Sequence, residues 1–208
     1  MYCPAHFQED RPEAWLGLIE HFPLGTVITS GPDGLNADHI PLQHVAEGGA
    51  WGKLIGHVAR ANPLWQLAAD QEVLVVFQGP SAYISPNWYA TKQDGGKVVP
   101  TWNYAVVHAH ARLKALHEPA QILGILNRLT HQHERTQAHP WQVSDAPTVF
   151  TDKLLPSIVG IELSITRMQG KWKVSQNQPQ ANRQGVVQGL LSQGTEPGQQ
   201  MADLVKHG

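Results

Sequence analysis

The chain has 208 residues, of which 41% are hydrophobic, so it can build the core of an ordinary domain without disulfides or structural metal. A formal net charge of −2 and the lack of any Lys/Arg run exclude a general attraction to nucleic-acid phosphates. The single Cys3, the lack of a bilayer-length apolar stretch and an N-terminus without signal-peptide features predict a cytoplasmic protein with no membrane contact.

The first third of the chain alternates helix and strand signals. An acidic cap at Asp10, followed by Pro12 and Glu13, predicts an amphipathic helix that ends at Pro23. A cap and proline at Asn62–Pro63 predict a second, short helix. Turn residues separate the predicted strands, which cover 24–30, 36–45 and 50–59.

The remainder of the chain contains longer strands and one long helix. The apolar run 73–78 predicts a strand buried on both faces, and 81–85 continues it after Gly79–Pro80. Helical periodicity from Glu118 to about Gln137 predicts a long helix. Strict alternation predicts a strand over 159–165, which a turn at Gln169–Gly170 would end. A further strand is predicted over 105–116, and two short helices are predicted in the tail.

Six or more strands in meander order, with helices between them, predict an α+β and mainly β fold. The predicted architecture is an antiparallel β-barrel with inserted and flanking helices. No repeat or linker interrupts the chain, so we expect a single domain over 1–208, with a small C-terminal helical appendage from about 180. Periodicity alone does not separate this barrel from other α+β arrangements.

Blocks spread along nearly the whole chain resemble the signature of the PaiB family, usually described as FMN-binding negative transcriptional regulators. In the family's order the blocks are 39–41 (HIP), 56–63 (GHVARANP), 79–89 (GPSAYISPNWY), 99–104 (VPTWNY), 107–108 (VH), 173–177 (KVSQN) and 185–186 (GV). The resemblance implies the split β-barrel of pyridoxamine-phosphate oxidase and flavin reductases. It also implies a homodimer with two FMN sites at the subunit interface. Gln178 stands where the family often has Arg, which weakens a phosphate role for that segment.

FMN requires an anion site for its phosphate, and the segment 57–63 suits this need. The Arg60 guanidinium can make bidentate contacts to a phosphate, and a helix opening at Asn62–Pro63 would offer unpaired N–H groups. The alternative is that Asn62 only caps a helix and Arg60 lies on the surface. The family resemblance favours the phosphate role.

Two further segments suit the flavin ring. The segment 38–41 lies on the strand that passes the ring in split barrels, where its backbone could meet N5 and O4. Pro41 removes a ladder donor, which predicts an edge strand or a bulge. Trp102 and Tyr104 could cover the ring, and Asn103 could bond its pyrimidine edge, although the same aromatic group also suits a dimer interface. The cofactor-binding candidates are therefore Asp38, His39, Ile40, Pro41, His57, Val58, Ala59, Arg60, Asn62, Trp102, Asn103 and Tyr104.

Redox chemistry would belong to the cofactor, because the sequence offers no convincing general acid or base, and we predict no catalytic residue. The two His-x-His pairs, at 108 and 110 and at 131 and 133, lack a third ligand at metal-binding spacing, so no metal site is predicted. A total of 12 histidines leaves a haem-binding split barrel open as an alternative. The family's label leaves a DNA-binding repressor open, although the sequence shows neither a helix-turn-helix nor a basic stripe.

Overall fold

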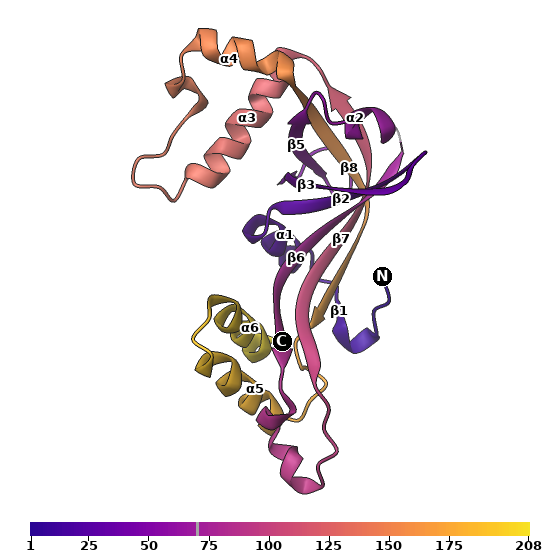
Figure 1. The fold of residues 1–208 in the computed structure, drawn as a ribbon, viewed down its shortest axis with the longest axis vertical. Helices are drawn as coiled ribbons and strands as arrows, with labels where there is room; N and C mark the ends of the chain where they lie inside the picture. The colour runs from indigo at the N-terminus through magenta and orange to yellow at the C-terminus, as the bar shows by residue number, and fades with distance from the viewer. Residues whose placement is uncertain (70) are drawn as a thin grey trace. The chain divides into compact units, whose positions relative to one another are not determined.

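The computed structural model describes residues 1–69 and 71–208, and these form two compact units. The long strands β6, β7 and β8 contribute residues to both units (Figure 1). Unit 1 comprises Met1–Leu18, Gln78–Val107 and Gln169–Gly208, and unit 2 comprises Ile19–Phe77 and His108–Met168.

In the described residues, eight strands form one mostly antiparallel sheet with the order β3-β2-β6-β7-β8-β5-β4, and β1 pairs with β8. The order places β3 and β4 at opposite ends of this path. The strands are β1 (Gln8–Glu9), β2 (Leu24–Gly31), β3 (Gly34–Pro41), β4 (Gln43–Val45), β5 (Lys53–Ala59), β6 (Glu72–Ile84), β7 (Thr101–Leu116) and β8 (Ile158–Lys173).

Within unit 2 the sheet curls into a barrel that stays split. The two end strands, β3 and β4, are consecutive in the chain and are separated only by Leu42, which is 0% exposed. The two edges of the sheet therefore come together at Leu42, although among the described residues no hydrogen-bonded ladder joins β3 to β4. Inward-facing side chains such as Val27, Leu54 and Ile161 are 0% exposed and belong to the core. The predicted fold class, an antiparallel split barrel, is confirmed.

Six α-helices accompany the sheet in the described chain. In unit 2, α3 lays Ile125 and Leu129 on Val45 and Ile55 of the barrel wall. In unit 1, α5 and α6 lie side by side (Figure 1) and pack on a core that includes Ile84 and Val174. The helices are α1 (Pro12–His21), α2 (Leu64–Leu67), α3 (Pro119–Glu134), α4 (Thr148–Leu154), α5 (Gln180–Ser192) and α6 (Glu196–His207). The 3₁₀ turns are η1 (Ala5–Phe7), η2 (Pro86–Trp88), η3 (Ala90–Asp94), η4 (Val143–Asp145) and η5 (Leu155–Ser157).

Three predictions about strands are wrong. The run 36–45 is two strands, because the chain leaves one edge of the sheet at Pro41 and joins the other at Gln43. The segments 73–78 and 81–85 are one strand, β6, which runs through Gly79–Pro80. The expected turn at Gln169–Gly170 lies inside β8, where Gly170 pairs with Glu9 and a Cβ would overlap the indole of Trp15.

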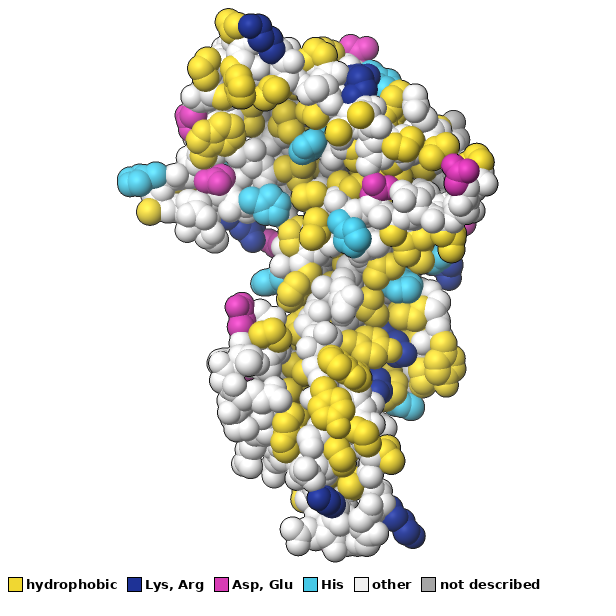
Figure 2. Space-filling view, in the orientation of Figure 1, with side chains coloured by type: hydrophobic (Ala, Val, Ile, Leu, Met, Phe, Trp, Pro, Cys, Tyr) yellow, Lys and Arg dark blue, Asp and Glu magenta, His cyan; other side chains and the backbone are white. Residues whose placement is uncertain are grey.

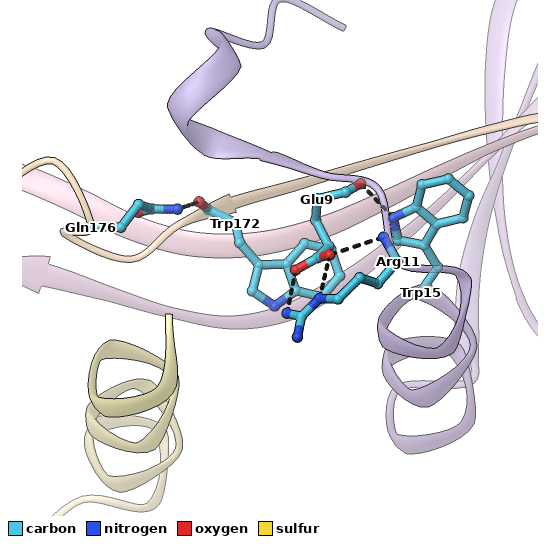
Figure 3. Close-up of polar contacts among 5 residues, drawn as sticks. All are labelled: Glu9, Arg11, Trp15, Trp172 and Gln176. Carbon is cyan, nitrogen blue, oxygen red and sulfur yellow. Dashed lines mark hydrogen bonds and ion pairs between the residues drawn. The ribbon is translucent and has the colours of Figure 1, made fainter.

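The start of α1 is held by Glu9 rather than by the predicted cap Asp10 (Figure 3). The Glu9 carboxylate accepts the Arg11 backbone N–H at 3.0 Å and forms an ion pair with the Arg11 guanidinium at 2.7 Å. The hydrogen bond from Arg11 holds the pKa of Glu9 below its usual value, although burial opposes this shift. The Trp15 indole donates to the Glu9 carbonyl at 2.7 Å, which fixes the angle at which the helix leaves β1.

None of the helices formed by residues 1–69 and 71–208 combines the length and hydropathy that spanning a bilayer requires.

Candidate functional site

The segment 38–41 forms the end of β3, and its side chains alternate between two faces. Asp38 and Ile40 pair with Val27 and Gly25, so they lie on the inner face of the barrel, and Ile40 is buried. His39 and Pro41 lie on the outer face and are exposed. The strand order confirms the predicted edge position, since β3 has a strand partner on one side only in the described sheet.

The segment 57–59 forms the end of β5. Gly56 faces the barrel interior, where an added Cβ would lie 3.0 Å from the Pro41 carbonyl oxygen, so the two segments pass each other closely. His57 lies on the opposite face and pairs with Gly160, which packs beneath Ile122 and Ile125 of α3. Val58 is buried in the core and could offer a ligand only its backbone, whereas Ala59 is exposed.

Hydrogen bonds position Arg60 and Asn62 in the turn that follows β5. The Arg60 Nε and Nη2 donate to the carbonyl oxygens of Pro156 and Ile158. The Asn62 side-chain oxygen Oδ1 accepts the Leu64 N–H at 2.8 Å, and the side-chain Nδ2 donates to the Asp38 carboxylate at 2.7 Å. The structure therefore brings the segments 38–41 and 57–62 together in unit 2.

The helix that opens after Asn62 is shorter than the predicted anion site needs. It is a single turn, α2, so its dipole is small, and Asn62 already occupies the Leu64 N–H. A neighbouring cavity of about 500 Å³ is lined by Asp33 and Asp38 and by no Lys or Arg. A phosphate would therefore be repelled at this cavity, whereas the Arg60 guanidinium lies in the turn that follows β5.

The predicted aromatic group at 102–104 belongs to unit 1, and its members do not share one surface. Because side chains alternate along a strand, Trp102 points outward and Asn103 points inward on β7. Trp102 is 57% exposed and makes an edge-to-face contact with Tyr83, with ring centroids 6.2 Å apart. Tyr104 is half-buried, with the ammonium of Lys171 lying 5.2 Å from its ring centroid.

Asn103, a predicted flavin contact, faces a polar cavity of about 360 Å³ in unit 1, whose other lining residues were not among the predicted site residues. The Asn103 amide is 1% exposed and donates to the Ser175 hydroxyl at 2.9 Å. Ser175 adopts φ +65°, the left-handed region that costs a non-glycine residue about 1–2 kcal/mol. Lys173 lines the same cavity, where its ammonium donates to the Thr101 hydroxyl and to the Trp102 carbonyl.

The KVSQN block begins at Lys173, the last residue of β8, and its side chains make different contacts. Lys173 and Ser175 face the cavity, whereas Val174 is fully buried in the core beneath α5 and α6. The Gln176 amide donates to the Trp172 carbonyl (Figure 3), and its oxygen accepts the Val174 N–H at 2.8 Å. The signal that could have identified this site was the run of polar residues directly after a strand, with Asn103 on the adjacent strand β7.

Burial shifts the pKa values of several side chains. It lowers the pKa of His57, whose buried Nδ1 has no hydrogen-bond partner among the described residues. It lowers the pKa of Lys173, with a further contribution from the charge of Lys171. It also raises the pKa of Tyr89, which lines the cavity in unit 1.

The histidine pair at 108 and 110 lies in unit 2, where burial is the largest cause that lowers both pKa values. The His110 ring contacts the Arg167 guanidinium at 2.8 Å, and its Nδ1 lies 3.7 Å from the Glu72 carboxylate. Among residues 1–69 and 71–208, no group of three or more His, Cys, Asp or Glu side chains is arranged to hold a metal ion.

The chain is similar to known proteins at the levels of family, sequence and fold. Residues 1–167 match the family model described as "Putative FMN-binding domain". The chain is 35% identical over 242 residues to the uncharacterized protein AN0679 of Emericella nidulans, covering 99% of this chain and 96% of that protein. It is 30% identical over 207 residues to the protease synthase and sporulation protein PAI 2 of Bacillus subtilis, covering 99% and 97%.

Among solved structures, the chain shares its fold with the FAD and haem binding protein of Mycobacterium smegmatis. The TM-score is 0.58 at 14% identity, and the match covers 80% of this chain and 73% of that protein. The FMN-binding family model confirms the flavin cofactor expected from the sequence, and the fold match agrees with the split barrel. The chain therefore belongs to the PaiB-type family of FMN-binding split-barrel proteins.

Proposed function

We propose that this protein binds FMN as a redox cofactor where the end of β3 meets the turn after β5. The observation that carries this proposal is the 2.7 Å hydrogen bond from Asn62 to Asp38, which joins the two segments that the family resemblance implies as contacts of the flavin ring and its phosphate. The close approach of Gly56 to the Pro41 carbonyl supports the same placement, because a side chain at 56 would force the strands apart.

Arg60 holds the phosphate in this proposal. A guanidinium has five N–H donors, and hydrogen bonds to Pro156 and Ile158 occupy two of them and fix its plane. The remaining donors can bind phosphate oxygens with charge assistance. The acidic cavity beside Asp38 disfavours the phosphate on that side of Asn62, so the anion is directed toward Arg60.

The backbone of β3 orients the ring in this proposal. Ile40 is buried, so that residue can contribute only main-chain groups, and the unpaired edge of β3 offers such groups. His39 and Pro41 border this edge on the outer face. When bound, FMN supplies hydride or electron transfer, so we place the protein among flavin-dependent oxidoreductases.

We further propose a homodimer in which Trp102 lies at the interface, because an exposed indole in edge-to-face contact with Tyr83 is typical of surfaces that associate. Any effect of this protein on transcription would be indirect, through a small molecule or a partner protein. Direct repression through DNA is not favoured, because a net charge of −2 provides no attraction to the phosphate backbone.

The test is a titration of the purified protein with FMN, followed by tryptophan and flavin fluorescence. We expect saturable binding in the micromolar range or tighter. Arg60→Ala should weaken binding by about 10- to 100-fold, which corresponds to the loss of one charge-assisted contact. Arg60→Lys should recover part of the affinity, because it keeps the charge but not the fork of donors.

Arg128→Ala is the matched control, since Arg128 is exposed on α3. The FMN affinity of this variant should equal that of the wild type. Circular dichroism checks that each variant folds, because Arg60 also holds the carbonyls of Pro156 and Ile158. The absorbance spectrum separates flavin from haem, which would show a Soret band. Lack of FMN binding at tens of micromolar would refute the proposal.

A further inference from the structure

The cavity in unit 1 is composed of buried polar groups and exposed cations. Its floor is made by Asn103 and Ser175, which are 1% and 3% exposed. Asn182 of α5 lines one wall and is 2% exposed. At about 360 Å³ the cavity is large enough for a small organic molecule.

The charge of the lining is positive. Among the described residues that line it, Lys97 and Lys173 are charged and none is Asp or Glu. Lys173 uses two of its three N–H donors on Thr101 and Trp102, and no hydrogen bond from the third is found in the described residues. No carboxylate in the described part of the chain forms an ion pair with Lys173. A half-buried ammonium without an anionic partner favours a negatively charged ligand.

The polar groups around the cavity are fixed before any ligand binds. The Asn103 amide is bonded to Ser175, whose backbone adopts the left-handed conformation. Asn182 accepts the Thr91 N–H at 3.1 Å and donates to the Gln178 side chain at 3.0 Å. Such preorganisation lowers the entropy lost on binding. Val98 and Val99 add apolar side chains to the lining of the cavity.

We propose that this cavity binds a small molecule that places one carboxylate or phosphate group beside Lys173 and an apolar or aromatic body against Val98 and Val99. Lys97 contributes long-range attraction from the exposed loop before β7. Asn103, which was predicted to bond the flavin ring, belongs in this proposal to the cavity in unit 1, whereas the flavin phosphate is assigned to Arg60 in unit 2. It would give the protein a second ligand, either a substrate or an effector.

The experiment is isothermal titration calorimetry of the full chain with three probes, namely benzoate, phenyl phosphate and neutral benzamide. We expect the anions to bind with dissociation constants between tens of micromolar and about one millimolar. Benzamide has the shape of benzoate without its charge and should bind at least tenfold more weakly. The comparison of benzoate with phenyl phosphate identifies which anionic group the cavity prefers.

Variants test whether the lysines carry the binding. Lys173→Met should weaken benzoate binding at least tenfold, and Lys97→Met should weaken it severalfold. Lys97 is exposed and makes no described hydrogen bond, so this variant keeps the test informative if Lys173→Met does not fold. Lys153→Met, on α4 in unit 2, is the control and should bind benzoate as the wild type does.

Two results would overturn the proposal. Equal affinities for benzoate and benzamide, or wild-type affinity in both Lys173→Met and Lys97→Met, would show that no anion site exists here. Competition between benzoate and FMN in the same titration would assign the cavity to the flavin phosphate instead. If FMN fails to bind while benzoate binding depends on Lys173, the flavin proposal fails and this one stands.

Discussion

Individual side chains in this protein take their roles from the strand face on which they lie. His39 and Asp38 are neighbours in the sequence, yet one lies outside the barrel and the other points inward to meet Asn62. The same alternation separates Trp102 from Asn103. Alternation is readable from sequence, but which face is inner depends on pairing partners that are distant in the chain. The sequence predicted that the segments 38–41 and 57–62 both contact the flavin, but it neither placed them side by side, as the structure does, nor assigned a direction to each side chain.

His57 is the residue whose titration should be visible in the stability of the fold. Burial lowers its pKa in the folded protein, whereas the unfolded chain has the ordinary value near 6.5. The unfolded state therefore binds the proton more strongly. The contribution of His57 to the unfolding free energy is fully present above about pH 6.5, and it decreases as the pH falls toward the folded pKa. We expect urea denaturation to give a smaller unfolding free energy at pH 5.5 than at pH 7.5.

The contribution of His57 can be isolated by substitution. His108 and His110 also have lowered pKa values, so wild-type pH dependence is a sum over several histidines. His57→Gln should reduce the difference in unfolding free energy between pH 5.5 and pH 7.5, by up to about 1.4 kcal/mol for each unit of pKa shift removed. An unaltered pH dependence in His57→Gln would contradict the assignment.

Elements were predicted well where periodicity was strong and poorly where glycine and proline were taken as turns. The long helix α3 and the alternating first half of β8 lie where the sequence predicted them. Gly79 and Gly170, in contrast, lie inside long strands because their missing side chains make room for Leu18 and Trp15. A turn glycine and a packing glycine look identical in one sequence. Only the three-dimensional neighbours distinguish the two.

A substitution in α5, which packs on Trp88 in unit 1, tests this packing role of glycine. An added Cβ at Gly189 would overlap the Trp88 ring, and one at Gly185 would overlap the Trp88 carbonyl. Gly189→Ala should therefore destabilise the protein by about 1–3 kcal/mol through overpacking, although alanine is the better helix former. Thermal or urea denaturation measures the change.

Gly124→Ala in α3 is the matched control, since an added Cβ there meets no atom within 4 Å. This substitution should stabilise the protein by up to about 1 kcal/mol through helix propensity alone. The two alanine variants should therefore shift stability in opposite directions. A Gly189→Ala protein as stable as Gly124→Ala would show that α5 does not pack on Trp88 in solution.

At the scale of the whole molecule, low charge and exposed aromatic surface favour self-association. Charged residues make up only 15% of the chain, and the net charge of −2 gives little repulsion between copies. In unit 1, Tyr83, Val99 and Trp102 are 46%, 73% and 57% exposed, and Figure 2 shows apolar side chains gathered over the strands of this unit. An exposed apolar group of this kind marks an interaction site more often than a solvated surface. The dimer was implied by the family resemblance, and the aromatic residues at 102–104 only suited such an interface, because their sequence does not show whether they lie on the surface.

Sedimentation velocity tests whether Trp102 forms the dimer interface proposed above. A single chain has a mass of 22.9 kDa, so the wild type should sediment as a species of twice that mass at micromolar concentration. Trp102→Arg places a charge in the interface and removes an aromatic anchor, which typically costs 2 kcal/mol or more, so it should shift the equilibrium strongly toward monomer. Trp141→Arg is the matched control, because Trp141 is also about half exposed, at 47%, but belongs to unit 2. A dimer that survives Trp102→Arg and dissociates in Trp141→Arg would place the interface on unit 2. A wild-type protein that stays monomeric at high micromolar concentration would rule out the dimer and any flavin site shared between two subunits.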